Sequence, residues 1–153
     1  MEDILMKLQI ELIPKTCWGS NVRTKVKKSD WDKIRKAVYE KEGMHCHICG
    51  ESCTSLDAHE IWEFDEKNSI QRLVDIIGIC KSCHNTIHFG RAQKIGCQKE
   101  AIAQFLKVND CDMVDLRNEL LKVEEVYMRR SKIKDWKLDL TLITNKGFSI
   151  KED

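Results

Sequence analysis

Two Cys-x-x-Cys pairs constrain this chain more than any other feature of its sequence. Cys46 and Cys49 lie in "HCHICG", Cys80 and Cys83 lie in "ICKSCH", and 30 residues separate the two pairs. Each pair predicts a tight knuckle with both sulfurs on one side of a turn, and two knuckles complete the tetrahedral thiolate shell that Zn²⁺ prefers. Gly50, directly after the first pair, is suited to such a turn. The sequence therefore predicts a structural zinc held by Cys46, Cys49, Cys80 and Cys83.

Two other interpretations of these cysteines stay open. A Cys-Cys-His-His site can borrow His84 or His88, and a redox dithiol is possible, although its usual surrounding pattern is missing. In a reducing compartment, eight cysteines indicate metal thiolates rather than disulfides. The remaining four are scattered and are expected to be inert: Cys17, Cys53, Cys97 and Cys111.

Composition places the chain among soluble globular proteins. Its 153 residues are 42% hydrophobic and 33% charged, which fits a single domain over residues 1–153. The apolar runs fall far short of the ~20 residues that span a bilayer. The start, "MEDILMKLQIELIPK", lacks the basic region and cleavage site of a signal peptide. We expect a cytoplasmic protein with no membrane partner, and the oligomeric state stays open.

Charge is unevenly distributed along a chain whose net charge is only +1. Residues 15–36 carry eight Lys or Arg, and residues 81–99 carry four with no acid. Between them, residues 51–75 hold seven acids and two bases. Bulk charge does not indicate nucleic-acid binding here, but an acidic stretch between basic ones suits a cation site that also meets a polyanion. Solvated surface charge is the alternative for any one of these runs.

Hydrophobic periodicity predicts strands at both ends and three helices between them. Alternation over residues 4–12 predicts a half-buried strand that ends at Pro14, and residues 136–142 repeat the pattern, so we expect the two to pair. Ser29 and Asp32 resemble a capping box at the start of the first helix. The helices are predicted over residues 30–42, 98–108 and 112–130.

The histidines form a second pattern within the same segment. His84 and His88 are four residues apart, so a helix places both on one face, near enough to share a cation. His59 lies in "LDAHEIW", which with "VDIIGI" predicts two short strands between the knuckles. A hairpin of these strands brings His59 towards the pair. His45 and His47 flank the first knuckle and are expected on its surface, with zinc ligation as the alternative.

These residues resemble the HNH nucleases, whose site is a ββα-metal finger often braced by a two-knuckle zinc. The resemblance covers residues 44–92, about a third of the chain, and the matching residues occur in the family's order. They are Cys46, Cys49, His59, Cys80, Cys83, His84 and His88. The resemblance implies an α+β fold whose core, 44–92, lies between an N-terminal strand and helix, 1–43, and C-terminal helices and a strand, 93–153.

The sequence departs from the family pattern at two places. The family's Asn position is occupied by Asp75, whose carboxylate can take over the role but changes the charge of the site. The family's metal-ligand and base positions align in two ways. One alignment makes His59 a ligand and Glu60 the base; the other makes His59 the base and leaves Ala58 or nearby Asp57 in the ligand position. We favour His59 as the base, with Glu60 as the alternative.

The resemblance implies single-metal hydrolysis of DNA phosphodiester bonds, as an endonuclease or nickase. His84 and His88 are then ligands of a catalytic Mg²⁺, Mn²⁺ or transition-metal ion, in addition to the structural zinc. Arg91 and Lys94 are expected to contact neighbouring phosphates. The competing hypothesis is a non-catalytic zinc module that binds nucleic acid or a protein partner.

Overall fold

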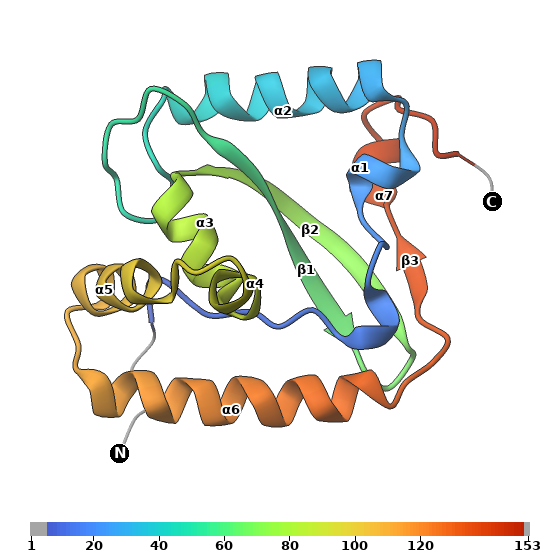
Figure 1. Ribbon diagram of the computed structural model, residues 1–153. Coiled ribbons are helices and arrows are strands. Elements are labelled where there is room, and N and C mark those ends of the chain that lie inside the picture. The colour runs from blue at the N-terminus through green and yellow to red at the C-terminus, as the bar shows by residue number, and fades with distance from the viewer. Residues whose placement is uncertain (1–5, 152–153) are drawn as a thin grey trace.

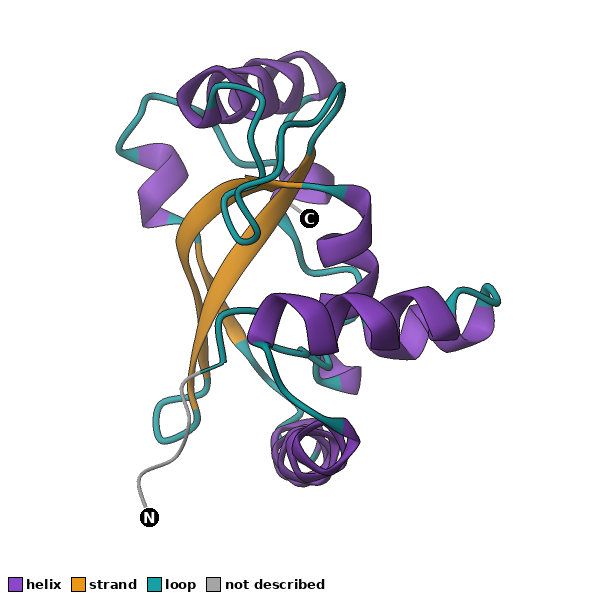
Figure 2. Cartoon of the chain, turned by 90° about the vertical axis from the view of Figure 1, so that its left-hand side faces the viewer, coloured by secondary structure: helices purple, strands orange, loops and turns teal. Residues whose placement is uncertain are grey.

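Two long helices lie on opposite sides of a small three-stranded sheet (Figure 1). They are α2 (Lys28–Glu42) and α6 (Met113–Ser131) in this computed structural model, which describes residues 6–151. In Figure 2 both are seen nearly end-on, and α5 (Gln98–Asn109) lies lengthwise between them. The shorter helices are η1 (Lys15–Cys17), α1 (Val22–Lys25), α3 (Lys81–Ile87), α4 (Phe89–Lys94), α5 (Gln98–Asn109) and α7 (Thr141–Thr144).

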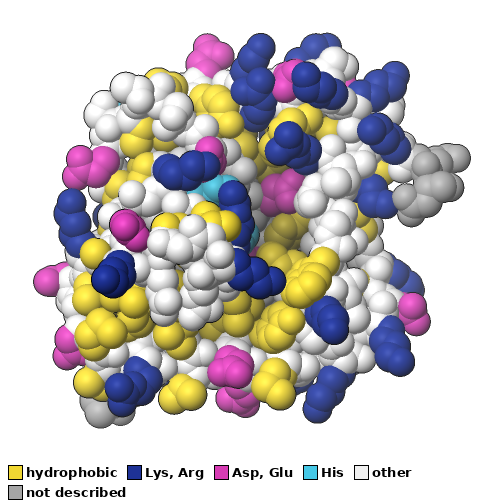
Figure 3. Space-filling view, viewed as in Figure 1, with side chains coloured by type: hydrophobic (Ala, Val, Ile, Leu, Met, Phe, Trp, Pro, Cys, Tyr) yellow, Lys and Arg dark blue, Asp and Glu magenta, His cyan; other side chains and the backbone are white. Residues whose placement is uncertain are grey.

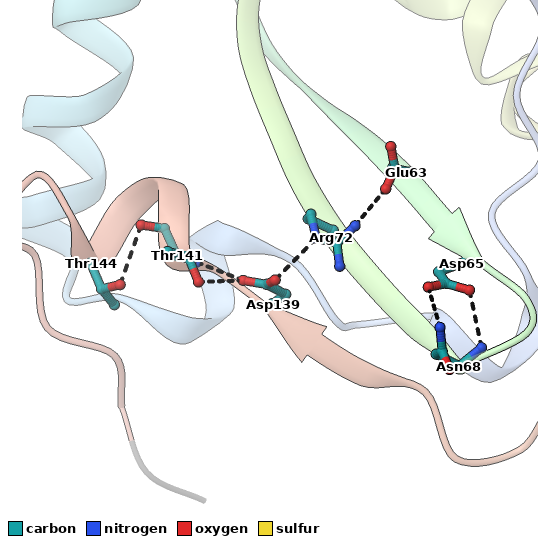
Figure 4. Close-up of polar contacts among 7 residues, drawn as sticks. All are labelled: Glu63, Asp65, Asn68, Arg72, Asp139, Thr141 and Thr144. Atoms are coloured by element: carbon teal, nitrogen blue, oxygen red, sulfur yellow. Dashed lines mark hydrogen bonds and ion pairs between the residues drawn. The ribbon is translucent and has the colours of Figure 1, made fainter.

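A β-hairpin forms the centre of the molecule and confirms the two strands predicted between the knuckles. β1 (Asp57–Asp65) and β2 (Ile70–Ile79) pair antiparallel, with a bulge where the register shifts between Ile61 and Trp62. Asp65 closes the turn, because its carboxylate accepts hydrogen bonds from the backbone and side-chain amides of Asn68 at 3.0 and 2.9 Å (Figure 4). The hairpin fixes the position of His59 relative to the segment that follows β2.

The predicted pairing of the two terminal strands is wrong. β3 (Lys137–Asp139) pairs parallel with β2, and the chain then turns into α7 instead of continuing as a strand. Asp139 explains the turn, since its carboxylate accepts from the backbone amide and hydroxyl of Thr141 at 3.0 and 2.6 Å (Figure 4). Arg72 of β2 donates to the same carboxylate at 3.1 Å and holds β3 against the hairpin.

No strand forms in the described part of the predicted N-terminal strand, residues 6–12. The alternation itself is real, because Leu8 and Ile10 are buried while Gln9 is exposed. The backbone finds other partners: the side chain of Asn109 bonds both the amide and the carbonyl of Leu8 at 2.8 and 2.9 Å. Residues 4 and 5 of that prediction lie outside the described residues.

The three predicted helices are confirmed within about two residues, but one predicted cap is wrong. α2 begins after Lys27 without a side-chain cap, and Asp32 accepts instead from the Arg35 guanidinium at 2.9 Å. α6 has the capping box, in which Asp112 and Asp115 exchange hydrogen bonds between side chain and backbone.

Helices cover both faces of the small sheet, which makes this a mixed α+β fold. One buried cluster lies between α2, α7 and the sheet, and a second joins β2 to α3 and the first cysteine pair. A third lies beneath α4, α5 and α6, centred on the fully buried Phe105. None of the helices in the described part of the chain has both the length and the apolar character needed to cross a bilayer.

Candidate metal centre and active site

The four predicted cysteines come together at one end of the hairpin. Cys46 and Cys49 lie in the loop before β1, and Cys80 and Cys83 lie at the start of α3. Their Sγ atoms are all within 4.8 Å of one another. In each pair the second backbone amide donates to the first sulfur, at 3.5 Å in the first knuckle and 3.4 Å in the second. Gly50 completes the first turn in the left-handed region, with φ of 78°.

The spacing of the sulfurs fits a tetrahedral ion. Zn–S bonds of about 2.3 Å place two sulfurs about 3.8 Å apart, and Sγ of Cys49 and Sγ of Cys80 are 3.8 Å apart. Burial works to raise the pKa of Cys46, but knuckle hydrogen bonds outweigh it and lower the pKa to about 7. Burial raises the pKa of Cys80 to about 11 and also raises that of Cys83. Because a bound cation deprotonates such thiols, the cluster can hold a metal such as zinc.

Three histidines come together beside this cluster, and one of them, His84, directly follows Cys83 in the chain. His59 comes from β1, His84 from α3, and His88 from the junction of α3 and α4. Each offers a ring nitrogen, and these atoms lie within 4.8 Å of one another. The ring centres of His84 and His88 are 4.9 Å apart, and that of His59 lies 5.7 and 5.4 Å from them. The hairpin thus brings His59 to the pair, as the sequence predicts.

The three imidazoles are neutral at pH 7 and have lone pairs for a cation or a proton. Burial, with smaller contributions from the charges of its two histidine neighbours, lowers the pKa of His59 to about 3. Burial also lowers the pKa of His88 to about 4. The pKa of His84 is lowered by burial as well, although the nearby Asp57 opposes the shift. Neutral imidazole is the form that binds metals.

Asp57 orients one of these rings. Its Oδ2 lies 2.9 Å from Nδ1 of His84 and 3.2 Å from Nζ of Lys81. Burial works to raise the pKa of Asp57, but these two hydrogen bonds outweigh it and leave the pKa below its usual value. A carboxylate on the outer nitrogen of a histidine fixes the tautomer that leaves the other nitrogen free for a metal. Asp57, which the sequence offers as an alternative metal ligand, therefore contacts His84, another candidate metal ligand.

Glu11 is a site residue that sequence reasoning misses. Its Oε2 lies 3.7 Å from Nε2 of His59, at the edge of the histidine cluster. Burial raises the pKa of Glu11 to about 7, against the opposing charge of Arg130 and with a smaller increase from Glu60. The contact joins residues far apart in the sequence, and Glu11 has only the alternating pattern of its neighbours as a signal.

Glu60 and Asp75, the other predicted catalytic residues, lie apart from the histidines. Glu60 lines the same cleft as His59, but it lies outside the histidine cluster, where its Oε1 accepts from the Val22 amide at 2.7 Å. Burial raises the pKa of Glu60 to about 7 despite the backbone hydrogen bonds it accepts. Asp75 pairs with Ile61 across the hairpin, and its carboxylate accepts from the amide of Ile76 at 2.8 Å. The structure thus brings neither carboxylate into the histidine cluster.

A cleft of about 1050 Å³ opens over the histidines. α3 and α4 form one wall with Arg91 and Lys94, segment 11–23 forms the other, and β1 lies between them with Glu60. Figure 3 shows the hollow, with histidine and acidic side chains at its floor and Lys or Arg side chains around its edge. Asp75 is not among the residues that line it. The two predicted phosphate contacts thus lie on the same wall as His84 and His88.

Comparisons of the chain with protein-family models, with curated proteins and with solved structures return no match. The chemistry of the site therefore rests on its own residues. Neutral imidazoles, a nearby carboxylate and basic side chains in one open cleft can bind a divalent cation and an anionic substrate together.

Proposed function

We propose that this chain is a metal-dependent DNA endonuclease or nickase of the HNH type. The observation that carries the proposal is the convergence of His59, His84 and His88 in an open cleft directly beside the four-cysteine cluster. A binding module has no need for three imidazoles in one place. The order of strand β1, strand β2 and helix α3 agrees with a ββα-metal finger.

In this proposal each of the two clusters, the four cysteines and the histidines, holds its own metal ion. Four thiolates fill a tetrahedral shell, so the cysteines would hold a structural zinc with no open position. His84 and His88 would hold a separate divalent ion with positions left for water and phosphate. Such an ion, when bound, stabilises the negative charge that develops on the phosphate oxygens.

His59 is the general base in this proposal. Its buried imidazole is neutral and has a free lone pair for a proton of the water that attacks the scissile phosphorus, but burial lowers its pKa to about 3, so the imidazolium needs a nearby negative charge. The P–O bond to the leaving oxygen breaks as the new P–O bond forms. The carboxyl group of Glu11, 3.7 Å from Nε2 of His59, is close enough to stabilise the imidazolium that results. Glu60 is the less favoured base because its Oε1 already accepts a hydrogen bond from the Val22 amide and lies outside the histidine cluster.

Arg91 and Lys94 extend the site along the substrate. Both are exposed on the cleft wall that carries His84 and His88. Their charges attract phosphates on either side of the scissile bond, which positions the backbone without reading its sequence. DNA is the proposed partner on this basis.

The position of Asp75 favours a second candidate function. The family's Asn position does not reach the histidine cluster in this chain, because Asp75 bonds the neighbouring backbone amide and lies outside the cleft. A zinc module that binds nucleic acid or a protein partner without cleaving it would tolerate that arrangement. Such a module would not lose a catalytic activity when His59 is replaced.

A plasmid-nicking assay separates the two candidates. The parent protein is expected to nick supercoiled DNA only when Mg²⁺, Mn²⁺ or a similar ion is added. His59→Ala and His84→Ala should each lose about 10²–10⁴-fold in rate. His45→Ala is the matched control, because this exposed histidine bonds the Gly43 carbonyl away from the cluster. Undiminished nicking in both cleft variants would refute the nuclease assignment.

A further inference from the structure

The cleft wall opposite the histidines carries an exposed tryptophan. Trp18 leaves 60% of its surface exposed and lines the cleft with segment 11–23. Its indole Nε1 donates to the carbonyl of Ile13 at 3.0 Å, which fixes the ring at the end of η1. No other aromatic ring among residues 6–151 packs on its face. A large aromatic side chain that is both held in place and exposed in a cleft is suited to stack on a flat ligand.

Unpaired positive charges lie in the same cleft. Arg23 lines it from α1, and Arg91 and Lys94 line it from α4. All three are exposed, and within the described range 6–151 none has an ion-pair partner. Cations on both walls, with an aromatic ring beside them, suit a ligand that alternates phosphates with flat bases.

We propose that the cleft binds an unpaired nucleotide whose base stacks on Trp18 while its flanking phosphates contact Arg23, Arg91 and Lys94. The inference rests on the proposed function and deepens it, because it names the substrate as single-stranded or locally unpaired DNA. Inside a duplex, neighbouring bases cover both faces of each base, so a ring held in place stacks on an unpaired base without the cost of separating two base pairs. The volume of about 1050 Å³ slightly exceeds the usual range of ligand sites, about 300–1,000 Å³. The cleft therefore has room for a base and its phosphates.

Fluorescence anisotropy without added divalent ion tests the subsite apart from cleavage. The probe is a labelled strand of about 12 nucleotides, alone or as a blunt duplex, and the protein is the full chain with His59→Ala. Adding Trp18→Ala should weaken binding of the single strand about 5- to 150-fold and leave duplex binding unchanged. Leu121→Ala, equally exposed at 61% and outside the cleft, should change neither.

Two further substitutions of Trp18 test whether the ring stacks on a base or only provides an apolar surface. Trp18→Phe should keep most of the affinity for the single strand, whereas Trp18→Leu should lose it like Trp18→Ala. Thermal melting confirms that each variant is folded. Independently, Arg91→Gln should reduce the slope of log affinity against log salt by about 0.7 on the single strand, as for the loss of one phosphate contact.

The outcomes separate this inference from the nuclease assignment. Equal affinity of Trp18→Ala and its parent for the single strand would overturn the subsite, as would equal affinity of Trp18→Leu and Trp18→Phe. Nicking by a protein that fails these binding tests leaves the nuclease function standing. Binding that depends on Trp18, in a protein that does not nick DNA with any divalent ion added, supports the subsite and refutes the nuclease.

Discussion

Asp57 is expected to set the affinity of the histidine cluster for its metal. Oδ2 of Asp57 lies 2.9 Å from Nδ1 of His84, which leaves Nε2 of that ring as the nitrogen available to a metal. The carboxylate also pairs with Lys81 at 3.2 Å, but the Lys81 side chain is 69% exposed, so this pair contributes little. The effect of Asp57 on metal binding is therefore expected to act through the orientation of His84.

Loss of such a partner costs about 10- to 100-fold in metal affinity, or about 1.4–2.7 kcal/mol. Asp57→Ala removes the acceptor and should fall near the upper end of this range. Asp57→Asn keeps a neutral acceptor at the same atom and should fall near the lower end. Isothermal titration with Mn²⁺ or Co²⁺ measures both affinities in protein first loaded with zinc, so that the proposed cysteine site is filled and the proposed histidine site is the one titrated.

The matched control is Asp65→Ala. Asp65 lies at the other end of β1, where it bonds Asn68 in the hairpin turn, far along the strand from His59 (Figure 4). Its loss should leave the metal affinity unchanged. An Asp57→Ala variant that binds Mn²⁺ as tightly as the parent, or an Asp65→Ala variant that is weakened as much, would refute the reasoning.

Three further predictions concern stability. Cys83→Ser should release the zinc, seen by native mass spectrometry, and lower the melting temperature, whereas Cys97→Ser, outside the cluster, should keep the ion. Phe105→Ala should cost about 3–5 kcal/mol in chemical denaturation because its side chain is fully buried, and exposed Leu121→Ala less than about 0.5 kcal/mol. A hydrogen bond from Arg129 holds the pKa of Glu66 at about 2, below the usual 4.5, so its contribution to stability is present above pH 4.5 and is lost as pH falls through 2. Melting of Glu66→Gln should therefore depend less on pH across that interval.

The central part of the fold was predictable because its signals are local. Two knuckles, two short strands between them, and the four-residue spacing of His84 and His88 follow from the local sequence, and together they place His59 beside the pair. The cluster of four cysteines is confirmed as a group that can hold a metal such as zinc.

The ends of the chain were not predictable in the same way. The alternating pattern indicates that the segment with Leu8 and Ile10 has one buried face, but it does not identify the hydrogen-bond partner of the backbone. For Leu8 that partner is the side chain of Asn109 rather than a strand. Asp139 ends β3 through a local hydrogen bond to Thr141 that competes with further pairing. The contact between Glu11 and His59 exists only after folding, so no local pattern can indicate it.

Anomalous X-ray scattering from crystals grown with Zn²⁺ and then soaked in Mn²⁺ tests the central claim most directly, that one turn and helix serve two separate metal sites. We expect a zinc peak among Cys46, Cys49, Cys80 and Cys83, and a manganese peak at His84 and His88 on the cleft side. A single peak, or a zinc ion shared between the cysteines and His84, would contradict it.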